Sequence, residues 1–215
     1  MSRSGLMVID PSITHPEIAS FNKIVEACPV PCTYHLPVMS DLDSISRALS
    51  NSCGIIILGS AASVYDKTNW QPILGEVLDR AMINDIPVLG ICFGHQFLAS
   101  QLGGKVEHLW DGGKRRGTRD VNIKMNSLID SDRICNLIYS HQEGIVQCPD
   151  DFEIIAYSDM VQIEGIGHTK KAIWGFQTHI EASWSFAQRQ GISPEDYEKA
   201  NEHGTQIMES FFKEI

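Results

Sequence analysis

A cysteine between two glycines is the residue best placed to do chemistry in this sequence. Cys92 follows the apolar residues 88–91, with Gly90 two positions before it, Gly94 two positions after it, and a helical pattern over 93–102. This spacing is typical of a strand–turn–helix elbow, in which glycines relieve crowding around a strained nucleophile. The N-terminal end of the helix would favour a thiolate. Free cysteines are more often small buried residues, but that interpretation leaves both glycines unexplained, so Cys92 is predicted to be a nucleophile.

A cysteine nucleophile needs a base, and the base needs a group that holds its ring. His179 and Glu181 stand two residues apart near the C-terminal end, and on an extended segment such residues project to the same side. Glu181 can then hold the far ring nitrogen of His179 while the near nitrogen faces Cys92. A single histidine is more often a surface or core residue, but the pair and the elbow together predict a Cys92–His179–Glu181 triad.

The elements that must position these residues alternate between strand and helix. Short apolar runs indicate strands, and runs with helical spacing separate them. The expected strands are 6–9, 33–36, 55–58 and 88–91, and the expected helices are 16–27, 72–84 and 93–102. This alternation predicts βαβ units with a parallel sheet. Ligands of such sheets bind in the crevice beyond the strand ends, where Cys92 is expected.

The pattern changes after Gly104, where shorter and partly antiparallel strands are expected. They are 105–108, 121–125, 153–157, 161–166 and 172–176. A last helix over 194–213 has Ser193 as its N-cap. We therefore expect one domain, residues 1–215, of the α/β class. Its open, mostly parallel central sheet is flanked by helices in the flavodoxin-like manner, with a small antiparallel sheet in the C-terminal half.

Composition argues against several other functions. The 215 residues carry 17 Lys plus Arg against 27 Asp plus Glu, a formal charge of −10, which disfavours nucleic acid and anionic membranes as partners. No run approaches the ~20 apolar residues of a membrane span, and no signal peptide is visible. Six cysteines without a C-x-x-C pair predict reduced thiols in the cytoplasm. Cys28 and Cys32 have a spacing that suits a metal, but no nearby histidine completes four ligands, so we expect no metal and no cofactor.

The two motifs together resemble the class I (triad) glutamine amidotransferase family. Residues 90–96 (GICFGHQ) are similar to its G-x-C-x-G-x-Q pattern, and residues 177–181 (QTHIE) to its Q-x-H-P-E pattern. Residues 55–66 (IIILGSAASVYD) resemble the family loop that normally contains G-G-P-x-S-V-Y, and residues 140–145 (SHQEGI) its S-H-x-D-x-V segment. The resemblance covers nearly the whole chain and is closest to the glutaminase domain of GMP synthetase.

This resemblance implies hydrolysis of L-glutamine through a γ-glutamyl thioester on Cys92. Backbone N–H groups of Ser60 and Phe93 would stabilise the oxyanion. His179 would protonate the departing ammonia and then activate water, with Glu181 fixing its tautomer. The positions that bind the substrate in the family correspond here to Gly59, Gln96, Ser140, His141 and Gln142.

The sequence departs from the family patterns at three points. Ser60-Ala61 stands where Gly-Pro is usual, Ile180 replaces the proline between histidine and glutamate, and Glu143 replaces an aspartate. The first matters most, because that loop is expected to supply an oxyanion-hole N–H. The triad is intact, so the departures bear on rate and subfamily more than on the type of reaction.

Glutaminase chemistry delivers ammonia, yet the chain contains neither a Walker loop nor an S-G-G-x-D-S pyrophosphatase loop. The basic stretch 112–117 (GGKRRG) lacks the Walker spacing and is expected to be a solvated turn or a docking surface. We therefore expect an ATP-dependent synthetase subunit in trans. Two alternatives remain open: a stand-alone γ-glutamyl peptidase or hydrolase with the same triad, and a regulatory or binding subunit that keeps the fold with little activity.

Overall fold

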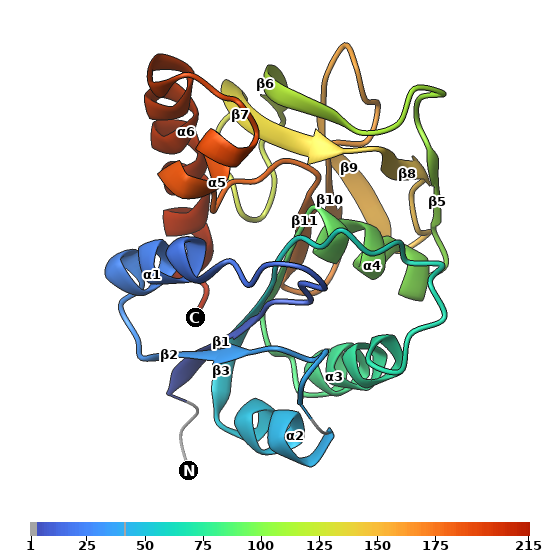
Figure 1. The fold of residues 1–215 in the computed structure, drawn as a ribbon. Coiled ribbons are helices and arrows are strands. Elements are labelled where there is room, and N and C mark those ends of the chain that lie inside the picture. Colours follow the sequence, from blue (N-terminus) through green and yellow to red (C-terminus); the bar gives the residue numbers. More distant parts are fainter. Residues whose placement is uncertain (1–3, 41) are drawn as a thin grey trace.

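A nine-stranded sheet forms the centre of the computed structural model, which describes residues 4–40 and 42–215 (Figure 1). In chain order its strands are β1 (Gly5–Ile9), β2 (Cys32–His35), β3 (Ser52–Ile57), β4 (Val88–Ile91), β6 (Arg115–Ile123), β7 (Arg133–His141), β9 (Phe152–Tyr157), β10 (Gly165–His168) and β11 (Ile173–Phe176). Their order in space is β2-β1-β3-β4-β11-β10-β9-β6-β7. A separate two-stranded antiparallel sheet pairs β5 (Lys105–His108) with β8 (Glu143–Gln147).

One half of the large sheet is parallel and the other half is antiparallel. The parallel half runs from β2 through β1, β3 and β4 to β11, and β10, β9, β6 and β7 continue it with antiparallel pairs. This confirms the expected open α/β sheet and the small antiparallel sheet. β11 comes late in the chain but lies next to β4, with Phe176 opposite Ile91. The segments that follow these two strands, which carry Cys92 and His179, therefore emerge side by side.

Helices cover both faces of the sheet (Figure 1). α2 (Leu42–Ser50), α3 (Gln71–Ile83) and α4 (Phe93–Gln101) lie on one face, whereas α1 (Ile18–Ala27) and α6 (Pro194–Phe212) lie on the other. The short α5 (Trp184–Arg189) packs against β7 and α6. Among the helices of the described residues, none has the length and apolarity that a membrane span requires.

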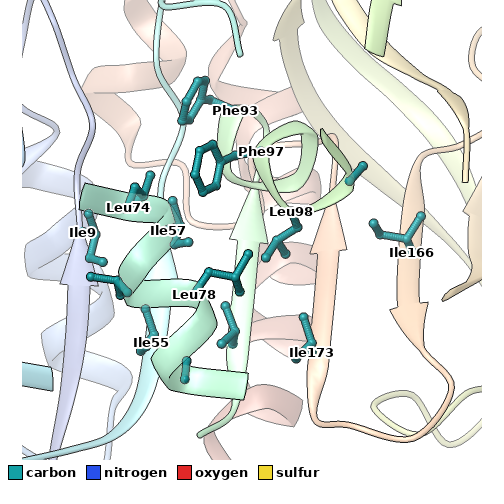
Figure 2. Close-up of a cluster of buried hydrophobic side chains, with 14 of the residues drawn as sticks. Ile9, Ile55, Ile57, Leu74, Leu78, Phe93, Phe97, Leu98, Ile166 and Ile173 are labelled. Carbon is teal, nitrogen blue, oxygen red and sulfur yellow. The ribbon is translucent and has the colours of Figure 1, made fainter. Parts of the chain in front are cut away.

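Alternate residues of the parallel strands fill two different cores, as expected for a sheet that is buried on both faces. Ile55 and Ile57 of β3 point into the cluster beneath α3 and α4, together with Phe93 and Phe97 (Figure 2). Ile56, between them, belongs to the opposite cluster with α1 and α6. The continuous apolar runs in the sequence are explained by this two-sided burial.

The structure corrects several sequence-based boundaries in the antiparallel half. β7 was not predicted, and β6 begins at Arg115, so the basic stretch 112–117 is not only a solvated turn but runs into a strand. The expected strand 161–166 is wrong, because the strand here starts at Gly165. The polar residues of β6 and β7 hid these strands, since Arg119 and Ser140 occupy buried positions where the pattern required apolar side chains.

Replacing Gly94 with alanine is expected to destabilise the fold by about 3 kcal/mol, the upper range for overpacking a core. α4 lies so close to the sheet that a Cβ at Gly94 would collide with the backbone carbonyl oxygen of Ile57. Chemical denaturation would measure the loss. Gly112→Ala is the matched control, because a Cβ there meets no atom within 4 Å. Equal denaturation midpoints for the two variants would contradict the proposed packing constraint.

Candidate active site

The backbone at Cys92 has the strained geometry of a nucleophile elbow. Its φ is 52°, a value that L residues other than glycine rarely adopt. The Cys92 N–H donates to the carbonyl oxygen of Phe176 at 2.8 Å, and its own carbonyl oxygen accepts from Gln96 N–H at 3.1 Å in the first turn of α4. A Cβ at Gly90 would stand 2.6 Å from the backbone of Gly94. Both glycines are therefore required by the close packing of α4 on β3 and β4, as the spacing predicted.

His179 and Glu181 lie together beside the elbow. His179 Nδ1 is 3.0 Å from Glu181 Oε1, and both side chains are buried. The His179 N–H donates to the carbonyl oxygen of Ile138 on β7 at 2.7 Å, which fixes the backbone of this segment. With Nδ1 bound to Glu181, Nε2 is the ring nitrogen left for Cys92. The ring also packs closely against the backbone of Gly59. A Cβ added at Gly59 would lie only 2.8 Å from His179 Cε1, so the ring has little room to move on this side.

The charge of His179 depends on its burial and on its two neighbours, Cys92 and Glu181. Burial lowers the pKa of His179, but the charges and hydrogen bonds of Cys92 and Glu181 outweigh it and raise this pKa to about 10. The positive form of the ring is therefore the stable one at neutral pH. A positively charged ring beside a cysteine sulfur can act as an acid that donates a proton.

Cys92 lies at a cavity of about 300 Å³. The cavity is lined by Ser60, Ala61, Ala62, Ser63, Asp66, Cys92, Gln96, Lys114, Ser140, His141, Gln142 and Glu143. An adjoining hollow reaches Gly59, His179 and Glu181 from the other side. The structure thus brings every side chain or backbone group predicted for substrate contact to one region, from β3, α4, β7 and the segment after β11.

The loop after β3 places Ser60 beside Cys92 without backbone strain. Ser60 is not among the described non-glycine residues with a positive φ. Its hydroxyl donates to the carbonyl oxygen of Pro11 at 2.8 Å and accepts from Ala62 N–H at 3.1 Å. Phe93, the first residue of α4, has an amide N–H that no carbonyl within the helix can accept. The two amides predicted for an oxyanion hole therefore lie at the cavity and at the adjacent helix N-terminus.

Three of the predicted substrate-binding side chains are engaged within the protein. Gln96 Nε2 donates to Glu143 O at 2.7 Å and to Gln177 Oε1 at 3.0 Å. Ser140 Oγ donates to Gln190 Oε1 at 2.7 Å. His141 is buried between Glu143 O and Arg119, and burial followed by the charge of Arg119 lowers its pKa to about 3, so its ring stays neutral. These side chains shape the cavity wall, while Gln142 is exposed at its edge.

A buried ion pair that sequence reasoning missed supports the wall at His141. Arg119 Nε and Nη2 each lie 2.6 Å from an oxygen of Glu164, which is fully buried, and Nη2 is also 2.9 Å from His141 Nε2. The guanidinium stacks 4.3 Å from the centre of the Tyr139 ring. The sequence contained one signal of this ion pair. Arg119 stands two residues before the buried Val121, so on a strand its side chain points to the same, inward side.

Lys114 was also missed as a site residue, because the basic stretch 112–117 was interpreted as a turn or docking surface. It lines both the cavity and the adjoining hollow. Within the described part of the chain, no group of His, Cys, Asp and Glu side chains has the arrangement of a metal site, and this includes the Cys28–Cys32 region. The site therefore combines a cysteine, a histidine and a carboxylate with a cavity that carries charges of both signs.

Comparison with known proteins agrees with this geometry. A family model described as glutamine amidotransferase class-I matches residues 19–193. A GMP synthase (glutamine-hydrolysing) from Clostridium perfringens is 32% identical over 160 residues, which are 73% of this chain and 29% of that protein. One subunit of the GMP synthase (glutamine-hydrolysing) from Methanococcus aeolicus is 30% identical over 142 residues, which are 63% of this chain and 64% of that polypeptide.

Among solved structures, a glutamine amidotransferase from Thermotoga maritima has a TM-score of 0.77 at 20% identity, with 99% of this chain and 98% of that chain covered. At this identity the likeness shows the fold. The chain spans about three tenths of the length of the first curated relatives that it matches.

Proposed function

The chain belongs to the class I glutamine amidotransferase family, and on that premise we propose that it hydrolyses the side-chain amide of L-glutamine to glutamate and ammonia. The observation that carries this proposal is the assembled Cys92, His179 and Glu181 at a cavity large enough for an amino acid. A regulatory subunit that has lost activity would not need to retain a strained cysteine beside a buried His–Glu pair.

The first half of the reaction forms the thioester. The Cys92 sulfur bonds to the amide carbon of glutamine, and the carbonyl electrons move onto oxygen, which the N–H groups of Ser60 and Phe93 would stabilise. His179 then gives the Nε2 proton to the amide nitrogen as the C–N bond breaks and ammonia leaves. Glu181 holds the ring through Nδ1 at 3.0 Å while the ring loses its charge.

The second half hydrolyses the thioester. His179 Nε2 takes a proton from water as the water oxygen bonds to the γ-carbonyl carbon. The C–S bond then breaks, its electron pair returns to the Cys92 sulfur as thiolate, and glutamate leaves. Gly59, Gln96, Ser140, His141 and Gln142 are proposed to hold the rest of the substrate, and their place around the cavity and the adjoining hollow supports this.

A glutamine analogue that carries an electrophile in place of the amide is expected to label Cys92 selectively and to stop ammonia release from glutamine. Peptide mapping by mass spectrometry would locate the label, and an ammonia assay would follow the activity. Cys28, Cys53 and Cys135 serve as internal controls, since these thiols lie outside the cavity lining. Labelling mainly at those residues would count against the proposal, and faster turnover of γ-glutamyl dipeptides than of glutamine would favour a peptidase.

We also propose that the ammonia passes to an ATP-dependent synthetase, in line with the GMP synthases among the relatives. All six cysteines are unpaired in the structure, which supports a reducing compartment such as the cytoplasm. A glutaminase assay with and without a GMP synthetase subunit would test the partner. An unchanged rate and no amination of the acceptor would oppose it.

A further inference from the structure

A lysine that is distant in the sequence contacts the backbone next to Glu181. Lys23 on α1 is half-buried, and its Nζ donates to the carbonyl oxygen of Ala182 at 3.1 Å, across 159 positions of sequence. Ala182 directly follows Glu181. Lys23 and Glu181 also line one cavity of about 200 Å³, which lies between α1 and α6 and is separate from the cavity at Cys92.

Only one of the two carboxylate oxygens of Glu181 has a hydrogen-bond partner among the described residues. Its Oε1 contacts His179 Nδ1, but its buried Oε2 has no hydrogen-bond partner among the described residues. The cavity wall around it is mostly apolar, with Ile24, Ala27, Met208 and Phe212. A buried carboxylate with an unpaired oxygen is costly unless a positive charge lies nearby. Lys23 brings such a charge into the same cavity.

The need for this charge changes during the proposed reaction. In the resting enzyme, the imidazolium of His179 balances Glu181. Once the thioester has formed, Cys92 is uncharged and His179 has given its proton to ammonia, so Glu181 faces a neutral ring. Arg189 lines the hollow on the other side of Glu181, but its guanidinium is paired with Glu17 at 2.6 Å. The charge balance of Glu181 then depends most on Lys23.

We propose that Lys23 is a positioning residue that balances the charge of Glu181 and holds its segment in place while His179 activates water for hydrolysis of the thioester. This inference rests on the proposed glutaminase function. It assigns to Lys23 a role in the second half of the reaction that the Cys–His–Glu motif does not contain. Without the ammonium, the buried Glu181 carboxylate would have no compensating charge in the acyl-enzyme and would hold His179 less firmly as a base.

The charge state of Lys23 is sensitive to its surroundings. Burial lowers its pKa and the charge of Glu181 raises it, with a net decrease to about 8. The titratable groups that share its cavity are Glu181 and, on α1 itself, Glu26, whereas the side chains contributed by α6 are Thr205, Met208 and Phe212, which carry no charge. Lys23 is therefore protonated below about pH 8 and loses its charge above it, so its contribution should be lost on the alkaline side.

Lys23→Met is expected to lower kcat for glutamine about tenfold, the size typical of one member of a coupled charge network. Because only the second half-reaction slows, KM should fall in parallel and kcat/KM should stay nearly constant. Intact-protein mass spectrometry should show the γ-glutamyl adduct on Cys92 accumulating, with a burst of ammonia. Lys213→Met, an exposed lysine after α6, is the control and should leave all of these unchanged.

The pH profile separates this role from a structural one. Wild-type kcat should fall above about pH 8, and Lys23→Arg, whose guanidinium stays charged, should keep kcat high to a higher pH. An unchanged kcat in Lys23→Met, or an equal loss of kcat and kcat/KM without adduct, would overturn the inference. If Lys23→Met fails to fold, an alkaline profile of Lys23→Arg identical to wild type would overturn it. A wild-type protein that releases no ammonia would instead refute the proposed function.

Discussion

Cys92→Ala is expected to reduce glutamine hydrolysis by at least about 10⁴-fold, because removing a triad member leaves only binding and oxyanion stabilisation. The methyl group of alanine cannot attack the amide carbon, and no other cysteine lines the cavity. Ammonia release at saturating glutamine measures the effect. The fold should survive, since the strained φ of 52° is set by the hydrogen bonds of the elbow and not by the sulfur.

The same variant should also change His179. With the thiolate gone, burial opposes only the charge of Glu181, so the pKa of His179 should fall below its value of about 10. An NMR titration of the imidazole protons would follow this change. Cys148→Ala provides the control, as its thiol lies outside the linings of the two hollows at the triad, near Phe152. Turnover near the wild-type rate in Cys92→Ala would refute the assignment of the nucleophile.

His179→Gln is expected to cause a loss of similar size, about 10⁴-fold, because one ring serves both half-reactions. Glutamine can donate a hydrogen bond to Glu181 through its side-chain amide, but it can neither donate a proton to ammonia nor take one from water at neutral pH. The rate of Cys92 labelling by the electrophilic analogue should fall as well, since the thiolate loses its positive partner. Ammonia release and labelling rate are the two measurements.

His168→Gln, on β10, is the matched control and should keep both rates, since His168 lies outside the linings of the two hollows at the triad. Equal melting temperatures would show that the substituted proteins are folded. If His179→Gln retained more than a few per cent of the turnover, another residue would have to act as the base. The neutral His141 at the cavity wall would then be the next candidate for substitution.

Two departures from the family pattern have structural explanations. Ser60 does not need a positive φ, and its hydroxyl ties the loop to Pro11. Ile180, in place of proline, is buried, and its N–H, which proline lacks, donates to Thr178 O at 3.2 Å. Gly204 lets α6 lie directly against the backbone of Ile180. Both substituted segments are therefore held by hydrogen bonds and close packing of their own.

The sequence alone determined the proposed reaction centre and the parallel half of the sheet. Cys92, His179 and Glu181 could be predicted because local spacing reports local geometry: glycines around a turn, and two side chains on one side of an extended segment. The strands β1, β3 and β4 were equally visible, since burial on both faces leaves continuous apolar runs.

The tertiary structure decided the antiparallel half of the sheet and the charged residues around the site, because these features depend on contacts between segments that are distant in the sequence. β7 and the first half of β6 carry polar residues at buried positions. Arg119 is paired there with Glu164, which directly precedes β10. Lys114 and Lys23 look like ordinary surface lysines in the sequence. Only the fold brings one to the cavity at Cys92 and the other to Ala182 behind the triad, since long-range contacts leave no local pattern to detect.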